Sequence, residues 1–286
     1  MATGRTALTD EEAERLRAFE RRRHDQMAAT YHGFFAHVTS LAIEPLLNAA
    51  GVAAGARHLD VATGPGLLAA EAHRRGARVI AVDLSPGMVE LAGRLHPDVE
   101  FRIAEVERLP FPDRSFDAIT CSFGLGHFPF PEAALAECVR TLRPGGVVAF
   151  SWWAEPSRQR VQGLFRDAIA EVGASPPPEL PKGHSSLRFC DIEEFRRLLD
   201  GGGLEAVKIE DHEATHCVSD VETLWQGGLG SLALSASAVL HQDAATQAAI
   251  KAALERRAAA YQTPEGLQIP VAFRVGAARR CQTLRV

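Results

Sequence analysis

The stretch H-L-D-V-A-T-G-P-G-L-L-A-A-E-A, residues 58–72, decides how this chain folds. It joins a short apolar run that contains an acid, a glycine-proline-glycine turn and an alanine-rich segment of helical character. Strand–turn–helix units of this kind bind nucleotide-like ligands, because the glycines let the backbone pass close to the ligand and the helix N-terminus presents free N–H groups. Gly64, Gly66 and Ala69 have the G-x-G-x-x-A spacing of a dinucleotide site. Taken alone, this stretch permits either a dinucleotide or a ligand without phosphate.

The composition is that of a globular chain. Its 286 residues are 46% hydrophobic and 23% charged, which is enough for one substantial core. A net charge of −5 gives no basic footprint for nucleic acid. Five scattered cysteines without a C-x-x-C pair indicate free thiols. Because there is no run of about 18 apolar residues and no apolar N-terminal segment, we expect a soluble cytoplasmic protein without a membrane span.

Strands and helices alternate after the opening stretch. Runs of β-branched and apolar residues predict strands at 58–61, 78–83, 99–104, 116–122 and 147–153. Helical segments between them are expected at 66–75, 85–95 and 131–142. This order predicts a parallel sheet with right-handed crossovers.

The flanking segments extend the pattern. Thr9 and Glu12 have capping-box spacing and open a helix to about Arg23, and a second helix is expected over 34–48. Beyond Trp153 the predicted elements are a helix at 158–172, a proline-rich connector at 173–186, a helix after Asp191, a strand at 204–210, helices within 220–260 and a strand at 269–275. Together these give an α/β, Rossmann-like, mostly parallel seven-stranded sheet flanked by helices.

Several functional side chains are expected at one edge of this sheet. Asp60, Asp83, Glu105 and the pair Trp152 and Trp153 all fall where predicted strands end. Ligands of doubly wound sheets bind outside these carboxyl ends. Asp83 is where such folds place an acid on a ribose diol, which still permits NAD.

Five motifs resemble those of the class I S-adenosylmethionine (SAM)-dependent methyltransferases, in particular the small-molecule branch typified by the quinone-biosynthesis enzymes. They are L-D-V-A-T-G-P-G (59–66), V-D-L-S-P-G-M (82–88), A-E-V-E-R-L-P-F-P-D-R-S-F-D (104–117), S-F-G-L-G-H-F (122–128) and L-R-P-G-G (142–146). They follow the family order and spacing over about residues 31–150.

The resemblance implies SAM as cofactor, with S-adenosylhomocysteine as its product. Asp83 would bind the ribose hydroxyls, Glu105 would accept from the adenine amino group, and Phe123 would lie near the sulfonium. The residues implied to bind SAM are Tyr31, Asp60, Ala62, Thr63, Gly64, Gly66, Asp83, Leu84, Met88, Glu105, Val106 and Phe123. In two places the chain departs from the family: Ala62 replaces the commoner first glycine, and Glu105 is one methylene longer than the usual aspartate. A solvated loop acid is the alternative for Glu105.

His127 is the candidate general base, because it follows the fourth predicted strand in the loop expected to face the methyl group. The alternative is a neutral histidine that only shapes the pocket. His32, beside Tyr31, is a second candidate. No metal site is predicted, since the only close histidine pair, His212 and His216, lies at a strand end rather than on a helix.

The acceptor site is expected outside the central motifs. Trp152 and Trp153 are adjacent on a strand and point to opposite faces, so one of them could line the site while the other packs against a helix. The substrate-binding candidates are Trp152, Trp153, Phe34 and Trp225, and their apolar character indicates an apolar or aromatic acceptor. The alternative is that these aromatic residues pack the flanking segments on the core.

We therefore predict a single methyltransferase domain over residues 1–286. Its parts are an N-terminal helical lid (1–45), a SAM-binding core (46–154), lid elements on the substrate side (155–190 and 212–266) and segments that complete the sheet (191–211 and 267–281). The expected reaction moves a methyl group from SAM to O, N or C of a small apolar or aromatic metabolite. Quinone-like compounds and secondary metabolites are the expected classes. The alternatives are a SAM-assisted cyclisation or decarboxylation, an NAD-dependent oxidoreductase and a non-catalytic SAM-binding partner subunit.

Overall fold

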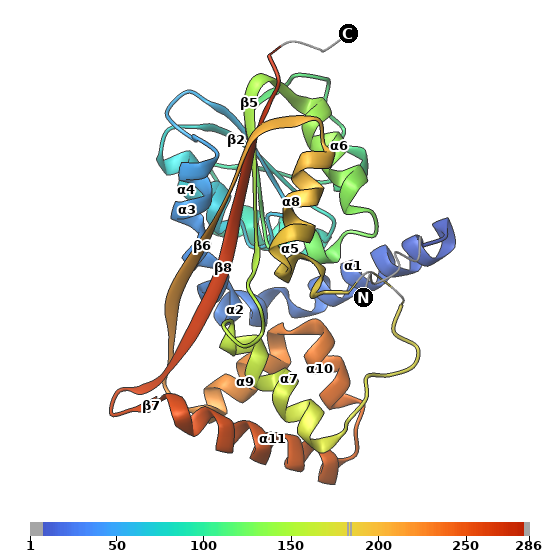
Figure 1. The fold of residues 1–286 in the computed structure, drawn as a ribbon, viewed down its shortest axis with the longest axis vertical. Helices are drawn as coiled ribbons and strands as arrows, with labels where there is room; N and C mark the ends of the chain where they lie inside the picture. Colours follow the sequence, from blue (N-terminus) through green and yellow to red (C-terminus); the bar gives the residue numbers. More distant parts are fainter. Residues whose placement is uncertain (1–7, 182, 184, 283–286) are drawn as a thin grey trace.

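An eight-stranded sheet with helices on both faces forms the centre of the computed structural model, which describes residues 8–181, 183 and 185–282 (Figure 1). The strands are β1 (Arg57–Val61), β2 (Arg78–Asp83), β3 (Glu100–Ile103), β4 (Phe116–Ser122), β5 (Leu142–Trp153), β6 (Leu204–Val218), β7 (Gln262–Thr263) and β8 (Gly266–Arg280). The α-helices are α1 (Asp10–Gly33), α2 (Phe35–Thr39), α3 (Ile43–Ala49), α4 (Leu67–Arg74), α5 (Pro86–Leu95), α6 (Pro131–Thr141), α7 (Arg160–Val172), α8 (Ile192–Gly201), α9 (Val221–Ser231), α10 (Ala233–Leu240) and α11 (Ala244–Ala258). Short 3-10 helices are η1 (Ser40–Ala42), η2 (Val106–Arg108), η3 (Leu125–His127), η4 (Arg188–Cys190) and η5 (Ala259–Tyr261).

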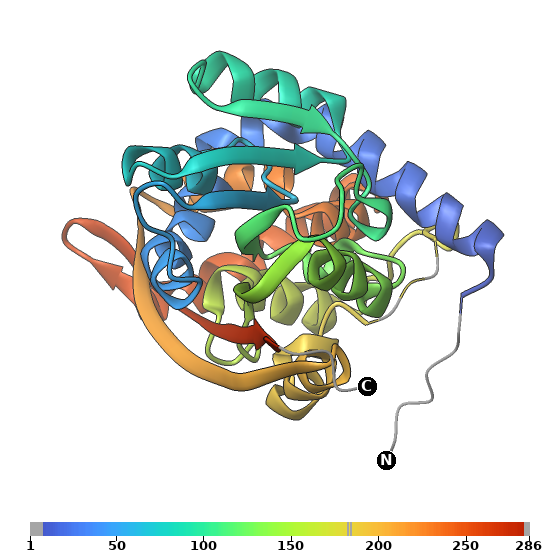
Figure 2. The same cartoon turned by 90° about the horizontal axis from the view of Figure 1, so that it is seen from above.

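The strand order is β3-β2-β1-β4-β5-β8-β6, which Figure 2 shows from above. β1 to β5 are parallel, whereas β8 runs antiparallel to both β5 and β6. This confirms the predicted Rossmann-like, mostly parallel fold. The predicted number of seven strands is corrected to eight, because residues 262–263 pair with the start of β8 as the additional strand β7.

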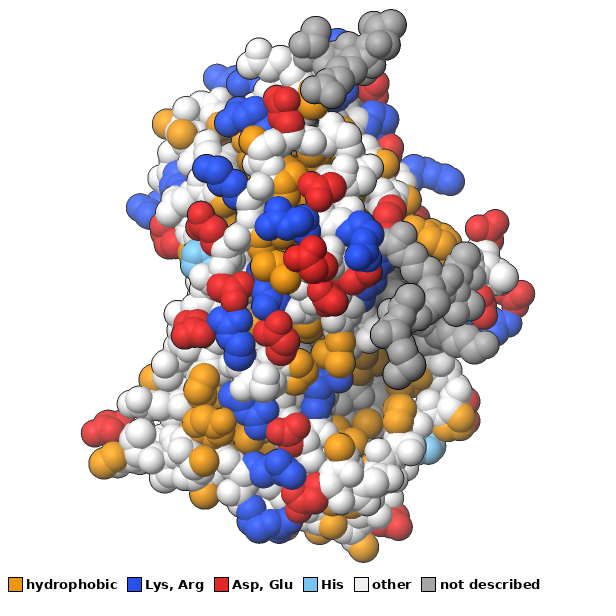
Figure 3. Space-filling model, in the orientation of Figure 1, with side chains coloured by type: hydrophobic (Ala, Val, Ile, Leu, Met, Phe, Trp, Pro, Cys, Tyr) orange, Lys and Arg blue, Asp and Glu red, His pale blue; other side chains and the backbone are white. Residues whose placement is uncertain are grey.

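Helices cover both faces of the sheet and one end of it. α3 and α4 lie on one face of the sheet and α6 and α8 on the other, as Figures 1 and 2 show. A helical layer of α7, α9, α10 and α11 covers the end of the molecule toward which β5 runs, and α1 passes beside it (Figure 1). Over β6 and β8, Lys and Arg side chains alternate with Asp and Glu side chains (Figure 3).

The predicted elements differ from the observed ones mainly in length. α1 continues to Gly33, beyond the predicted end near Arg23, while the predicted helix 34–48 is divided into α2, η1 and α3. β6 runs to Val218 because it pairs with β8 along nearly its whole length. Residues 212–218 thus belong to the sheet rather than to the segment that covers it.

A chain of buried polar groups crosses the sheet between β1 and β4. Thr120 donates its hydroxyl hydrogen to Asp60 (2.9 Å), and Thr63 donates to the other Asp60 oxygen (2.6 Å). His58 Nε2 lies 2.8 Å from the Thr120 hydroxyl oxygen, so it is the donor in that bond. Burial raises the pKa of Asp60 to about 7 and lowers the pKa of His58 to about 3.

The five cysteines are all free thiols, as expected. In the described part of the chain, no helix has both the length and the apolar character needed to cross a membrane.

Gly66 should tolerate substitution less well than Gly64. Both have left-handed backbones, with φ 82° and 54°, but a Cβ on Gly66 would lie 2.7 Å from the Phe101 ring, whereas a Cβ on Gly64 meets open space. We expect Gly66→Ala to cost about 2–4 kcal/mol of unfolding free energy and Gly64→Ala about 1–2 kcal/mol. Urea denaturation measures both values, and equal costs would contradict this account of the turn.

Asp60→Asn should change how stability depends on pH. Because the native pKa of Asp60 is about 7 and its ordinary value is 3.8, the folded chain holds a proton that the unfolded chain has released between these values. This group therefore lowers the free energy of unfolding as pH rises through that interval. Relative to the variant, the wild type should lose about 2 kcal/mol between about pH 5 and about pH 8. If the free energies of unfolding of the wild type and the variant, measured by denaturation, instead change equally with pH across this range, Asp60 is ionised throughout.

Candidate functional site

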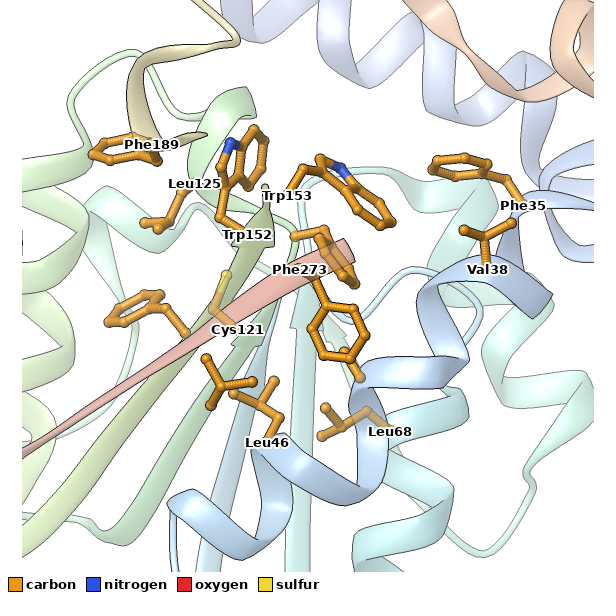
Figure 4. Packing of buried hydrophobic residues seen from close by; sticks show 14 of the residues in the cluster. Phe35, Val38, Leu46, Leu68, Cys121, Leu125, Trp152, Trp153, Phe189 and Phe273 are labelled. Atoms are coloured by element: carbon orange, nitrogen blue, oxygen red, sulfur yellow. The ribbon is translucent and has the colours of Figure 1, made fainter. Parts of the chain in front are cut away.

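A cavity opens where the parallel strands end beneath the helical layer. Its lining comes from the turns that follow β1, β2 and β4, from the end of β5, and from α1, α7 and α10. Figure 4 shows Trp152 and Trp153 at the end of β5, with Phe35 of α2 near Trp153. The ring centroids of Trp153 and Phe35 are 5.6 Å apart.

The turn after β1 forms one edge of this cavity. Ala62 and Gly64 line it, and both have φ 54°, in the left-handed region. Ala62 stands where the family it resembles has glycine, and the chain keeps the glycine-type backbone there at a cost of about 1–2 kcal/mol. Gly66 does not border the cavity, because it lies against the Phe101 ring.

Asp83, the last residue of β2, lies beside this turn. Its Oδ2 accepts from the Gly64 N–H (2.8 Å) and its Oδ1 accepts from the Ser85 N–H (2.9 Å). These bonds fix the carboxylate at the cavity wall, between the turn after β1 and the start of α5. Each oxygen keeps a lone pair for a ligand hydroxyl.

Glu105 follows β3 and also lines the cavity. Its Oε1 lies 2.6 Å from Nε of Arg17, which pairs with Glu107 as well. Burial raises the pKa of Glu105, and the Arg17 charge opposes this shift. The side chains of Leu84, Met88 and Val106 complete an apolar wall nearby.

The helix α1 closes one side of the cavity and is held by polar contacts. Asp25 Oδ1 accepts from the Ser85 hydroxyl (2.6 Å) and from the Gly87 N–H (2.9 Å), which places α1 on the N-terminus of α5. Tyr31, near the end of α1, lines the cavity, and burial raises the pKa of its phenol to about 12. The phenol therefore stays protonated near neutral pH.

His127, in η3 after β4, faces a carboxylate from this helix. Its Nδ1 lies 3.0 Å from Oε2 of Glu20, a residue only 8% exposed. Burial alone would lower the pKa of His127, but the charge and hydrogen bond of Glu20, together with the Asp83 charge, outweigh it and the net shift is upward. Burial would raise the pKa of Glu20, yet the charge and hydrogen bond of His127, with the charges of His24 and Arg23, bring it below its ordinary value. The two groups thus form a mutually stabilised pair, and none of the described residues hydrogen-bonds to Nε2 of His127.

The same pair has a third neighbour, His24, one helical turn after Glu20. His24 Nδ1 lies 2.8 Å from the Glu20 carbonyl oxygen and 3.5 Å from Oε2 of its side chain. One ligand atom from each of Glu20, His24 and His127 falls within 4.8 Å of the others, so these three side chains could hold a divalent metal ion. The sequence had predicted no metal site.

Both tryptophans border the cavity, although their side chains leave β5 in opposite directions. Trp153 stacks on Phe123 with ring centroids 3.7 Å apart, whereas Trp152 faces His127 (6.4 Å) and Phe189 (6.4 Å). The sequence had predicted that one of them would pack against a helix. Both meet the cavity because it spans the end of the strand rather than one face of it.

The structure brings twelve of the sequence-predicted site residues to this cavity: Tyr31, Ala62, Gly64, Asp83, Leu84, Met88, Glu105, Val106, Phe123, His127, Trp152 and Trp153. Asp60, at the end of β1, and Thr63 and Gly66, in the turn that follows it, do not border the cavity. His32, Phe34 and Trp225 also lie outside the lining. Phe34 packs against His216 (5.5 Å between ring centroids), and Trp225 stacks on Phe165 (5.9 Å).

Apart from Tyr31, the side chains that α1 contributes to the site are not predicted from the sequence. Arg17, Glu20 and Asp25 contact Glu105, His127 and Ser85 respectively. The spacing of Glu20 and His24, one helical turn apart, was visible in the sequence. Nothing in the sequence showed that His127 would face them.

Comparison with known proteins shows what this chain is similar to. Residues 59–150 match the family model described as a methyltransferase domain. The demethylmenaquinone methyltransferase of Renibacterium salmoninarum is 39% identical over 141 residues, which are 49% of this chain and 58% of that protein. The ubiquinone biosynthesis O-methyltransferase of Xanthomonas axonopodis pv. citri is 39% identical over 160 residues, 53% of this chain and 64% of that protein. The chain thus spans less than two thirds of the length of these relatives.

Among solved structures, the YcgJ protein of Bacillus subtilis has the same fold, with a TM-score of 0.52 at 20% identity. The superposition covers 87% of this chain and all of YcgJ, 100%. Together with the motifs and the strand order, these matches show that residues 59–150 are similar to the methyltransferase domain of these relatives and that the chain has the same fold as YcgJ.

Proposed function

We propose that this protein transfers a methyl group from S-adenosylmethionine to a small-molecule acceptor. The observation that carries the proposal is Asp83, fixed by the Gly64 N–H at the edge of a cavity inside a methyltransferase-type core. When bound, S-adenosylmethionine supplies an electrophilic methyl group, so the protein has only to orient the acceptor and exclude water.

The residues around Asp83 fit each part of this cofactor. The Asp83 carboxylate would accept from the ribose hydroxyls, and the apolar wall of Leu84, Met88 and Val106 suits an adenine ring. Glu105 would accept from the adenine amino group. The left-handed turn at Ala62 and Gly64 lets the backbone approach the methionine end, with Asp60 buried directly behind it.

The acceptor would occupy the opposite side of the cavity. Phe123 and Trp153 form a stacked aromatic wall there, and Trp152 forms a second wall beside His127. Flat apolar walls of this kind suit an aromatic or quinone-like ring. The two relatives described above act, by their names, in menaquinone and ubiquinone biosynthesis, which is consistent with an acceptor of that type.

His127 would take the proton that the acceptor loses. Its Nδ1 is engaged by Glu20, so Nε2 is the atom available to the acceptor. The Glu20 carboxylate stabilises the imidazolium that forms, as in other histidine–carboxylate pairs. Because only the neutral imidazole accepts a proton, turnover should rise with pH through the pKa of His127.

Asp83→Ala should weaken binding of S-adenosylhomocysteine by at least about tenfold, because it removes a charged hydrogen-bond acceptor and leaves the Gly64 and Ser85 N–H groups unpaired. Isothermal titration measures the affinity. Glu210→Gln, an exposed acid on β6, is the matched control and should bind as the wild type does. Unchanged affinity in Asp83→Ala would refute the cofactor placement.

Glu20→Gln should lower turnover about 10- to 100-fold with little change in cofactor affinity, because general-base catalysis contributes typically ~10²–10⁴-fold and the variant retains the imidazole. Loss of the carboxylate lowers the pKa of His127, so the acidic limb of the pH–rate profile should move to lower pH. His127→Ala should lower turnover further and abolish that limb.

A metal bound by these side chains would give different experimental results. If Glu20, His24 and His127 hold a metal that the reaction needs, then His24→Gln and treatment with a chelator should each abolish turnover. If His127 acts as a base, both treatments should leave most of the turnover. Elemental analysis of the purified protein provides an independent measurement of metal content.

A further inference from the structure

Arg166 of α7 is a cavity-lining cation without an acidic partner. Its Nη2 donates to the Ser186 hydroxyl (2.8 Å), and no carboxylate of the described residues lies within ion-pair distance. Four other arginines next to or on α7, η4 and β8 each pair with an acid: Arg158 with Asp211, Arg160 with Asp167, Arg188 with Glu194, and Arg274 with Asp211. The charge of Arg166 is therefore available to something in the cavity.

A second donor lies on the same face of α7. Gln159 is 1% exposed, and its Oε1 accepts from the Gln162 N–H (2.9 Å) at the start of the helix. Its Nε2 is buried without an acceptor among the described residues. Residues 159, 162 and 166 all line the cavity, because spacings of three and four return to one side of a helix. A buried N–H group without a partner costs about 1–3 kcal/mol, which an oxygen-bearing ligand would offset.

Contacts of Trp152 and Cys190 relate the part of the cavity lined by Gln159 and Arg166 to His127. The ring centroid of Trp152 lies 6.4 Å from that of His127. Cys190 lies near both Trp152 and Arg166, since the indole N–H and the guanidinium charge both oppose the upward shift that burial gives the pKa of its thiol. The Trp152 indole N–H is likewise buried without an oxygen or nitrogen acceptor among the described residues. Trp152 therefore lies near the proposed base, and through Cys190 it is also close to the unpaired cation.

We propose that Arg166, with Gln159 as a second donor, binds a carboxylate of the acceptor. The acceptor would then be an aromatic or apolar carboxylic acid, whose ring lies along Trp152 and whose reacting atom faces His127. This inference rests on the proposed methyl transfer and defines the class of its acceptor. A single guanidinium matches the one charge of a carboxylate and can bind it with two parallel hydrogen bonds.

The test measures binding of acids and their neutral analogues to the protein saturated with S-adenosylhomocysteine. The probes are salicylate, vanillate and hydroxyphenylacetate, each paired with its methyl ester. We expect at least one acid to bind roughly ten- to a hundredfold more tightly than its ester, the range of a charge-assisted hydrogen bond. Arg166→Gln should remove this difference, whereas Arg166→Lys should retain part of it because it keeps the charge.

Arg21→Gln is the matched control, because Arg21 also lines the cavity but lies on α1. This variant should keep the preference for the acid. A panel in which no acid binds more tightly than its ester, or an Arg166→Gln protein that keeps the preference, overturns the proposal. Failure of the methyl-transfer proposal is recognised separately, because the protein incubated with S-adenosylmethionine and the preferred acid would then form no methylated product, even though the acid still binds.

Discussion

The hydrogen bond from the Gly64 N–H to Asp83 Oδ2, 2.8 Å long, is the contact on which the site depends. It ties the left-handed turn after β1 to the end of β2, so that the turn and the acid keep one relative position. The other Asp83 oxygen accepts from Ser85, whose hydroxyl in turn donates to Asp25 of α1. One carboxylate thus connects the turn, the start of α5 and the helix that closes the cavity. A site held this way is preorganised, which is what a reaction governed by orientation requires.

The position of α1 follows from the same polar contacts. Its anchors are Arg17 at Glu105, Glu20 at His127 and Asp25 at Ser85, three points around the cavity. The remaining helices of the layer combine apolar packing, such as the stack of Phe165 on Trp225, with ion pairs such as Arg257 of α11 with Glu171 of α7. Because the anchors of α1 are themselves site residues, the position of this helix also fixes the histidine–carboxylate pair.

What the sequence could predict is what short-range patterns encode. The strand–turn–helix unit at 58–72 and the acid at Asp83 were predicted because their spacing is local. The pairing of Glu20 with His127 could not be, since these residues are 107 positions apart and only the tertiary fold brings them together. Phe34 and Trp225 show a second kind of information that the sequence pattern lacks. An apolar residue on a helix gives the same pattern whether it faces a cavity or the core, and the structure places both in packed interfaces.

The positions of the proposed acceptor-side residues along the chain bear on the proposed substrate. The sequence match to the methyltransferase domain covers residues 59–150, which contain Asp83, Glu105 and His127. Glu20 comes from α1 and Gln159 and Arg166 from the region of α7, all outside that match. Specificity resides in the groups that contact the acceptor, so the cofactor side can be shared while the acceptor differs. A neutral quinone ring does not require an unpaired guanidinium, so Arg166, which lies outside the matched core, is the residue on which the proposed choice of acceptor depends.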